Sequence, residues 1–417
     1  MDKKYQIDTP ENIRFLNEIR KKLLAFGKDV ISPDGTAYYL GDDGRPWPDF
    51  PRNTYETARM CHVYHMGAMM YRQEWKKQAD GAKKGLISAL HDEKNGGWFD
   101  GLLPDGKPKE GKLCYSHAFV ILAASDCLMA GDEEGKEFFD KALSVFDRYF
   151  WDEKDGMTCD TWDTSFSQKD SYRGLNANMH TVEALLNAAD ASGKEVYRQR
   201  AGRIIRRVVD LAAGNEWRIP EHYNDQWDPL LDYNEDRPAD PFKPYGATPG
   251  HGLEWARLIL QWASSTFDED DPDFHHFLEA SQKLFHRAKE DAWFADGAPG
   301  FVYTTDWSGK PIVSYRMHWV LAEAINTAAV LYRVTNQAYY ADSFAEFLAY
   351  LDEKVLDHDH GSWFHQLNNN NEVVGTVWPG KPDLYHAYQA TLIPYCDVNL
   401  SVCKAVRDGK YPDALNH

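Results

Sequence analysis

The sequence lacks the segments that would carry a chain into or across a membrane. Its first eight residues, Met1 to Asp8, contain no apolar stretch of the kind that a signal peptide needs. No apolar run approaches the roughly 20 residues of a membrane span. The six cysteines are scattered and form no Cys-x-x-Cys pair, which is typical of reduced thiols in a core. We therefore expect a cytoplasmic protein that has no membrane partner.

Basic charge and several common motifs are also scarce. The chain has 46 Lys and Arg against 65 Asp and Glu, a formal net charge of -19, and no run of basic residues. Nucleic-acid backbones and anionic membrane surfaces are therefore poor partners for it. Gly-x-Ser-x-Gly, a Walker A sequence, a strand-linked Gly-x-Gly-x-x-Gly and His-Glu-x-x-His are all absent. These absences argue against the serine hydrolases, nucleotide-binding enzymes and zinc peptidases that use those motifs.

Apolar and aromatic residues are plentiful. Apolar residues make up 43% of the 417 residues, which is enough to bury a large core. The aromatic share of 14%, with 14 Trp and 23 Tyr, is high. Aromatic side chains line sugar-binding clefts, but a tryptophan-rich core gives the same composition, so both interpretations stay open.

Helical patterns recur in pairs along the chain. In each pair an alanine-rich apolar segment is followed by a turn and then by an amphipathic segment. The predicted pairs occupy residues 54–90, 116–151, 178–213, 252–293 and 317–356, with a last half-copy at 385–398. The turns fall at 131–132, 191–194, 268–272 and near 335–336. Apolar helices are buried on most sides and amphipathic ones face water, so the pattern predicts an inner and an outer layer.

Segments rich in glycine and tryptophan separate some of the pairs. They lie at 92–98, 152–156 and 358–363 and contain Asn-Gly, Asp-Gly and His-Gly steps. Turn-forming steps flanked by alternating residues indicate short β-hairpins. We therefore predict an all-α fold, an (α/α)6 barrel of about six helical hairpins with short β-hairpins in its loops. Because no Pro/Gly/Ser linker interrupts it, residues 1–417 form a single catalytic domain in this prediction. An open solenoid is the alternative.

One cationic or imidazole side chain stands near the start of each predicted inner helix. Successive members are 58 to 71 residues apart, about one per repeat: Arg59, His117, His180, His251, His318 and His386. Equivalent helix ends of a ring gather at one mouth, so these residues are predicted to share a pocket. The alternative is that each only binds a loop carbonyl at its helix end.

Two of these histidines have a carboxylate one helical turn later. The pairs are His180 with Glu183 and His251 with Glu254, and residues at this spacing share a helix face. They fit either metal chelation or a histidine oriented by a nearby carboxylate. Without a metal-binding motif elsewhere we favour the second interpretation and expect no metal. A carboxylate pair for glycoside hydrolysis stays open, since 65 acids offer many pairs.

Four sequence blocks resemble the N-acylglucosamine 2-epimerase superfamily. They are residues 57–64, 176–184, 245–255 and 383–386, with further matching blocks at 163–168 and 300–303. The resemblance runs in order from about residue 12 to about residue 400. It is strongest to the aldose–ketose isomerase branch, which contains mannose isomerase and sulfoquinovose isomerase. The fold of this superfamily is an (α/α)6 barrel, in agreement with the repeat.

The resemblance implies that a free aldose and its 2-ketose are interconverted without a cofactor through a cis-enediolate. The two acid/base histidines of the family match His251 and His386. The matching substrate contacts are Arg59, Asn176, His180 and Glu254, with Tyr115, Trp319 and Trp378 as walls of the pocket. His117 is expected behind the pocket, and the role of His318 stays open.

The identity of the sugar depends on departures from the family pattern. In members that act on sulfoquinovose, the resemblance leads us to expect an arginine and two glutamines that hold the sulfonate. Here those places hold Pro241, His365 and Pro382, although Lys243 lies close in sequence. We therefore expect a neutral monosaccharide substrate and mannose–fructose isomerisation. The open alternatives are sulfoquinovose isomerisation, 2-epimerisation, a glycan hydrolase on the same barrel and an inactive sugar-binding protein. Assembly into a homo-oligomer stays open as well.

Overall fold

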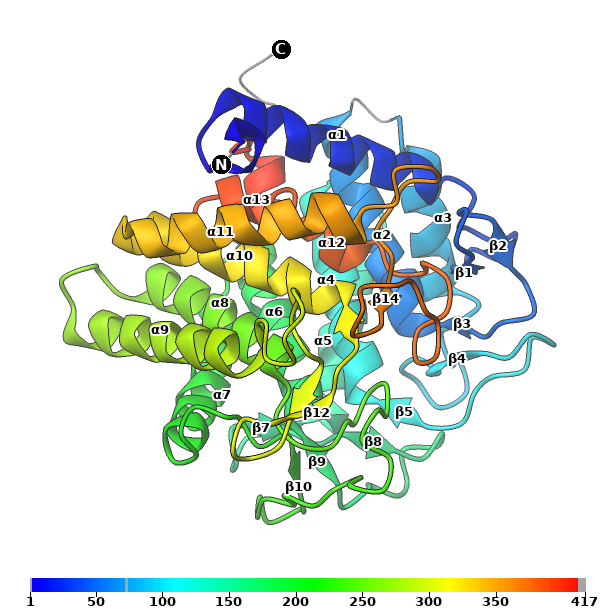
Figure 1. The fold of residues 1–417 in the computed structure, drawn as a ribbon. Helices are drawn as coiled ribbons and strands as arrows, with labels where there is room; N and C mark the ends of the chain where they lie inside the picture. Colours follow the sequence, from blue (N-terminus) through cyan, green and yellow to red (C-terminus); the bar gives the residue numbers. More distant parts are fainter. Residues whose placement is uncertain (1, 72–73, 412–417) are drawn as a thin grey trace.

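The computed structural model describes residues 2–71 and 74–411, and almost all of its regular structure is helical (Figure 1). The long helices are α1 (Pro10–Phe26), α2 (Thr54–Met70), α3 (Lys76–Ile87), α4 (Cys114–Met129), α5 (Gly135–Tyr149), α6 (Leu175–Ser192), α7 (Glu195–Ala213), α8 (Pro249–Thr266), α9 (Pro272–Ala292), α10 (His318–Thr335) and α11 (Ala338–Tyr350). The short ones are α12 (Tyr385–Gln389), α13 (Val402–Arg407), η1 (Lys3–Tyr5), η3 (Ile393–Tyr395) and a π-helical turn η2 (Leu351–Val355). No helix among the described residues is long and apolar enough to cross a membrane.

The even-numbered helices α2 to α12 form an inner ring. Each packs on the next, and α12 closes the ring between α10 and α2. Inner helices are buried on nearly all sides, whereas outer helices such as α7 bury one face. This arrangement confirms the predicted (α/α)6 barrel and excludes the open solenoid.

The last repeat differs from the sequence prediction. The predicted half-copy at 385–398 is helical only as far as Gln389, and Pro394 lies within the separate turn η3. Proline cannot donate the backbone hydrogen bond that a continuing helix needs. The helix that packs outside α12 is α1, at the other end of the chain.

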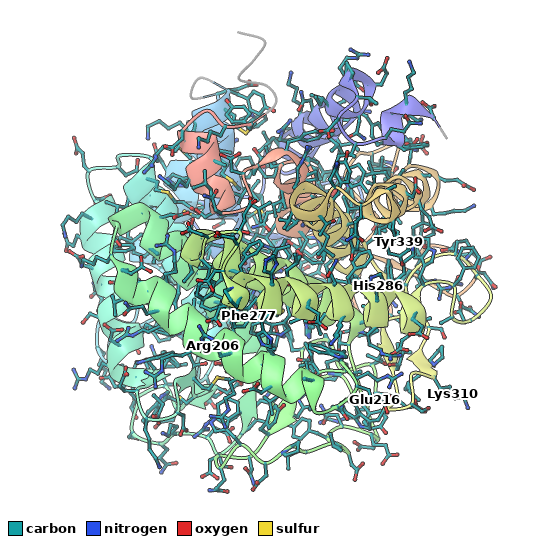
Figure 2. The ribbon with its side chains drawn as sticks, turned by 90° about the vertical axis from the view of Figure 1, so that its left-hand side faces the viewer. Arg206, Glu216, Phe277, His286, Lys310 and Tyr339 are labelled. Atoms are coloured by element: carbon teal, nitrogen blue, oxygen red, sulfur yellow. The ribbon has the colours of Figure 1, made fainter. Side chains whose placement is uncertain are left out.

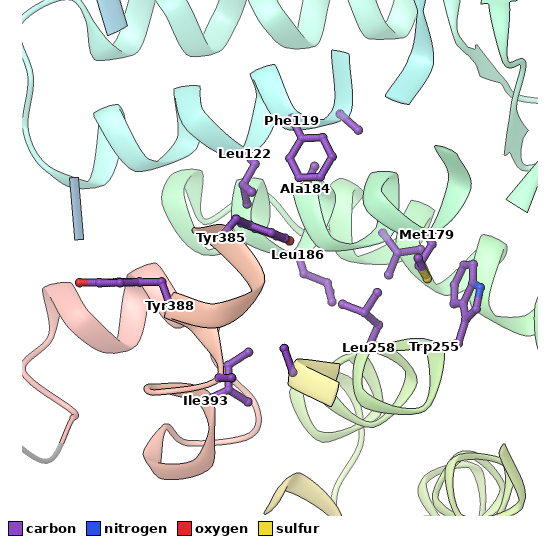
Figure 3. Close-up of a cluster of buried hydrophobic side chains, with 14 of the residues drawn as sticks. Phe119, Leu122, Met179, Ala184, Leu186, Trp255, Leu258, Tyr385, Tyr388 and Ile393 are labelled. Carbon is purple, nitrogen blue, oxygen red and sulfur yellow. The ribbon is translucent and has the colours of Figure 1, made fainter. Parts of the chain in front are cut away.

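The inside of the ring is filled by apolar side chains from facing helices. Figure 3 shows Phe119 and Leu122 of α4 meeting Leu186 of α6, Leu258 of α8 and Tyr385 of α12. All of them are at most 3% exposed. The six cysteines are buried too, and none forms a disulfide, as the sequence predicts.

The outer helices contact one another through mixed polar and aromatic faces. On the side shown in Figure 2, the Arg206 guanidinium of α7 lies 5.1 Å from the ring centre of Phe277 on α9. On the same face, His286 and Tyr339 bring α9 and α11 together, with ring centres 5.1 Å apart. Such contacts are typical of amphipathic helices that cover a core and face water.

Short strands fix the beginnings of the inner helices. The strands are β1 (Tyr39–Leu40), β2 (Pro46–Trp47), β3 (Arg52–Asn53), β4 (Gly101–Leu102), β5 (Lys112–Leu113), β6 (Trp151–Asp152), β7 (Met157–Thr158), β8 (Thr161–Trp162), β9 (Arg173–Gly174), β10 (His222–Tyr223), β11 (Thr304–Thr305), β12 (Pro311–Val313), β13 (Arg316–Met317) and β14 (Gln366–Leu367). All pairings are antiparallel: β1 with β2, β3 with β4, β5 with β8, β6 with β7, β9 with β10, β11 with β12 and β13 with β14. In four repeats the strand just before an inner helix pairs with the segment that follows the outer helix. These pairings hold the starts of the inner helices together at one end of the barrel.

The predicted turns between elements are confirmed. The segments at 92–98, 152–156 and 358–363 lie in hairpins closed by the pairs His91–Trp98, β6–β7 and Leu356–Trp363. Helix α6 ends at Gly193 with φ +69° and α10 ends at Asn336 with φ +52°. Glycine and asparagine are the residues that adopt this left-handed conformation most readily.

Candidate active site

A pocket of about 620 Å³, its open mouth included, lies at the end of the barrel where the inner helices begin. The structure brings all nine predicted site residues into its lining: Arg59, Tyr115, Asn176, His180, His251, Glu254, Trp319, Trp378 and His386. His318 also lines it, so five of the six side chains that recur once per repeat share the pocket.

His117 does not share it, which contradicts the prediction that all six residues converge. Its Nδ1 donates to the Leu113 carbonyl at 2.7 Å, and its Nε2 accepts the Trp98 backbone N–H at 3.1 Å. Burial lowers the pKa of His117 to about 3, so it is neutral. The residue therefore fastens the hairpin at 91–98 to α4, which is the helix-end role offered as the alternative.

His251, on the first turn of α8, has a carboxylate behind it. Its Nδ1 donates to Glu221 Oε1 at 2.8 Å, and Glu221 comes from the loop before β10. His251 is therefore oriented by Glu221 and not by Glu254, although Glu254 lines the same pocket. Because Nδ1 is engaged with Glu221, Nε2 is the nitrogen left to act in the pocket.

His386, on α12, has the same kind of support from another helix. Its Nδ1 is 3.2 Å from Glu323 Oε1 of α10, and Glu323 Oε2 accepts from Arg257 Nε at 2.8 Å. The Trp319 indole lies beside both histidines, with ring-centre distances of 5.1 Å to His251 and 5.9 Å to His386. The pocket thus presents two imidazole rings. Each has a carboxylate beside Nδ1 that leaves Nε2 available, which suits both rings to proton transfer.

Carboxylates and one guanidinium lie beneath the pocket: Glu254 lines it, and Glu183 and Arg257 line the neighbouring cavity. The His180 Nδ1 is 3.7 Å from both Glu183 Oε2 and Glu254 Oε1. Burial, with repulsion from Glu323, raises the pKa of Glu254 well above its usual value. Burial lowers the pKa of His180 to about 4, so its ring is neutral. Arg257 lies 3.7 Å from Glu254 and 3.9 Å from Glu183.

A second charged cluster holds Arg59 in place. Its guanidinium donates to the Tyr115 hydroxyl at 2.9 Å and lies 3.4 Å from Asp383. Burial alone would raise the pKa of Asp383, but Arg59 and His318 hold it well below its usual value. His318 Nε2 is 3.4 Å from Asp383, and its ring stacks on His365 at 3.7 Å. His318, whose role the sequence left open, thus supports this ion pair.

Glu56 adds a carboxyl with a raised pKa to the same cluster. Burial and the negative charge of Asp383 raise its pKa to about 7. Its Oε2 is buried without a hydrogen-bond partner and lies in the lining of the pocket.

Aromatic side chains wall the pocket. Phe242, on the loop before α8, packs edge-on against Tyr115 and Trp378 with ring centres 5.8 and 5.4 Å away. Asn176 donates to the Phe242 carbonyl at 3.5 Å, and its own Oδ1 is buried without a partner. Flat apolar faces beside unpaired polar atoms fit a sugar, which has apolar C–H faces and many hydroxyl groups.

Two sets of three side chains beneath the pocket each have ligand atoms close enough together to hold a metal ion. They are His180 with Glu183 and Glu254, and Glu254 with Glu323 and His386. Arg257 lies within 4 Å of all three glutamates. Because this guanidinium already lies against all three carboxylates, the geometry favours the metal-free interpretation of the His-x-x-Glu pairs.

Sequence reasoning missed Glu56, Glu221, Phe242, Arg257 and Glu323 as parts of this site. Arg257 had a local signal, since it follows Glu254 by one turn of α8. Glu221 and Glu323 had none, because their partners lie 30 and 63 residues away in sequence.

Comparisons with known proteins identify what the chain resembles. Residues 35–390 match the family model described as N-acylglucosamine 2-epimerase (GlcNAc 2-epimerase). A protein of Pseudomonas cannabina pv. alisalensis named D-mannose isomerase is 38% identical over 95% of this chain and 96% of its own length. A D-mannose isomerase of Thermobifida fusca is 37% identical over 94% of this chain and 96% of its own. A crystal structure of a D-mannose isomerase superposes with a TM-score of 0.84 and 27% identity, covering 91% of this chain and 96% of the other.

Proposed function

We propose that this chain, which belongs to the N-acylglucosamine 2-epimerase family, is an aldose–ketose isomerase that interconverts D-mannose and D-fructose without a cofactor. One observation carries the proposal: His251 and His386 face one aromatic-walled pocket, and each has its own carboxylate on Nδ1. The two curated relatives named D-mannose isomerase support the choice of sugar.

The reaction needs two kinds of proton transfer. Moving the carbonyl from C1 to C2 requires removal of the C2 proton, formation of a cis-enediolate and return of a proton to C1. Imidazole suits both directions because its usual pKa lies near neutrality. In our proposal His386 carries the proton from C2 to C1 on one face of the sugar. His251 opens the ring and moves the hydroxyl proton between the oxygens.

Hydrogen-bond donors around the pocket stabilise the negative charge of the enediolate. The Arg59 guanidinium is the cationic donor, and it is fixed by Tyr115 and Asp383. The neutral His180 ring adds a donor that brings no extra charge, and the Glu254 carboxyl, whose pKa is raised by burial, lies 3.7 Å from it. Donors that are fixed before the reaction act most strongly where water is excluded.

The charge of the pocket favours a neutral sugar over a sulfonated one. Arg59 is the only lysine or arginine among the described residues that line the pocket, and Asp383 already neutralises it. Lys243 lines a neighbouring cavity instead, where its ammonium lies 3.7 Å from the centre of the Tyr172 ring. Burial keeps His365 neutral by lowering its pKa well below the usual value. A sulfonate would therefore meet no free cation here.

The same site allows some 2-epimerisation. If His251 returned a proton to C2 from the face opposite His386, the product would be the 2-epimer rather than the ketose. The branch point is the enediolate, which both histidines can reach from the pocket wall.

An NMR experiment in heavy water tests the proposal. Mannose incubated with the protein, with EDTA present to remove loosely bound cations, should give fructose that carries deuterium at C1. Glucose formed with deuterium at C2 would measure the 2-epimerase share. Recovery of unlabelled mannose, or release of a new reducing end from an oligosaccharide, would refute isomerisation and favour binding or hydrolysis.

A further inference from the structure

A second cluster of reactive side chains lies in the barrel wall, apart from the pocket. Cys61 and His65 project from α2 and Cys127 from α4, and all three are buried. The two sulfur atoms are 3.9 Å apart, and Cys127 Sγ is 3.6 Å from His65 Nε2. No sequence motif indicates the cluster, because Cys127 follows Cys61 by 66 residues.

The distances fit a tetrahedral metal ion. An ion with bonds of about 2.3 Å to sulfur and about 2.0 Å to nitrogen holds its ligand atoms roughly 3.5 to 3.8 Å apart. The two measured distances, 3.9 and 3.6 Å, are close to these values. The three ligand atoms of Cys61, His65 and Cys127 all lie within 4.8 Å of one another.

His65 is oriented as a metal ligand would be. Its Nδ1 donates to the Cys61 carbonyl at 2.8 Å and lies 3.4 Å from Cys61 Sγ, while Nε2 faces Cys127 Sγ. Metal-bound histidines characteristically donate their other N–H to a carbonyl or a carboxylate. Asp132 Oδ2, in the turn between α4 and α5, is 3.1 Å from the same Nε2 and supports the ring from outside the set of three.

The charges of the cluster balance around a divalent cation. Lys83 lies 3.2 Å from Asp132 and neutralises it, so the two thiolates that form when the ion binds neutralise the ion.

An entry path exists, and it is remote from the sugar pocket. A groove lined by His65, Lys83 and Asp132 connects the cluster to the surface. Cys127 follows Tyr115 of the pocket by twelve residues of α4, about 18 Å along the helix axis.

We propose that Cys61, His65 and Cys127 bind one zinc ion that ties α2 to α4. Thiolates and an imidazole favour zinc over magnesium or calcium, which prefer oxygen ligands. Binding releases the proton of His65 Nε2 and any protons left on the two thiols. The ion has no part in catalysis, because it contacts no residue of the pocket.

Metal analysis of the purified full-length protein tests the proposal. We expect about one zinc per chain by mass spectrometry, and at least roughly tenfold less in Cys61→Ser and Cys127→Ser. Cys114→Ser is the matched control, since this cysteine is also fully buried on α4 and should leave the zinc content unchanged. Asp132→Asn should weaken zinc binding by roughly 10- to 100-fold.

A spectroscopic measurement keeps the test valid if a cysteine variant does not fold. Cobalt(II) added to wild-type protein freed of zinc should give a thiolate-to-cobalt charge-transfer band and the visible bands of a tetrahedral site. Absence of that band together with less than about a tenth of a zinc per chain overturns the proposal. A chain two hydrogens lighter and without zinc would overturn it too, because it would carry a disulfide in place of the ion.

Discussion

Replacing Glu221 with glutamine tests the acid/base pair of His251 without changing the shape of the pocket. Glu221 accepts the Nδ1 proton of His251 at 2.8 Å and is 4% exposed. The variant keeps the side-chain size but removes the charge opposite the imidazolium that forms when His251 takes up a proton. We expect the chemical step to slow while the sugar still binds, so kcat falls more than KM rises.

The magnitude follows from the geometry of the pair. Charge centres about 4 Å apart attract one another by about 4 kcal/mol at an effective dielectric of about 20, which is an upper bound. If between half and all of this attraction stabilises the transition state, its loss raises the activation free energy by about 2 to 4 kcal/mol. That corresponds to a loss of roughly 30- to 1,000-fold in kcat.

The assay is the initial rate of fructose formation from mannose, followed by NMR. Glu279→Gln on the outer helix α9 is the control, since it removes an exposed ion pair with Lys283 and should leave kcat unchanged. Glu221→Asp keeps the charge and should recover part of the activity. A kcat for Glu221→Gln within about threefold of wild type would show that His251 does not depend on this carboxylate.

Three further changes test other parts of the site. His386→Asn should abolish deuterium exchange at C2 and His251→Asn should not, by NMR in heavy water; the opposite pattern would exchange their proposed roles. Gly250→Ala should lower both activity and melting temperature, because a β-carbon there would come within 2.7 Å of Trp319 and 2.6 Å of Val320. An unchanged kcat would show that Trp319 can shift freely. Burial and Asp383 raise the pKa of Glu56 from 4.5 to about 7, so between these pH values the folded state binds more protons than the unfolded one. The wild-type protein should therefore lose stability as the pH rises from about 4.5 to about 7. Glu56→Gln should abolish this loss. Melting temperatures at pH 5 and pH 8 check this, and a variant that loses as much stability as wild type on going to pH 8 would contradict it.

Most of the barrel could be predicted from sequence because hydrophobic periodicity is a local property. The apolar segment of α4 and the one-sided pattern of α7 are each visible within a single helix. The pairing of α1 with α12 is not a local property, because these two helices lie more than 350 residues apart in the sequence. No local pattern links these two helices.

The site was predictable in position and only partly in its contacts. The repeat places one side chain near the start of each inner helix, and five of these six reach the pocket. The carboxylate partners depend on how neighbouring helices face each other. Glu254 shares a helix face with His251, yet its carboxylate turns to His180 of α6 and Arg257, and a loop supplies Glu221 instead.

The position of Trp319 connects the geometry to the choice of product. Its ring centre is 5.1 Å from His251 and 5.9 Å from His386, so the two imidazoles lie within about 11 Å of each other. A monosaccharide packed on the indole would have both within reach of its first two carbons and their oxygens. If one histidine acts at carbon while the other acts at oxygen, the product is the ketose. If both act at C2 from opposite faces, it is the 2-epimer. The balance between isomerase and epimerase therefore rests on how the indole orients the enediolate, and not on a different set of catalytic groups.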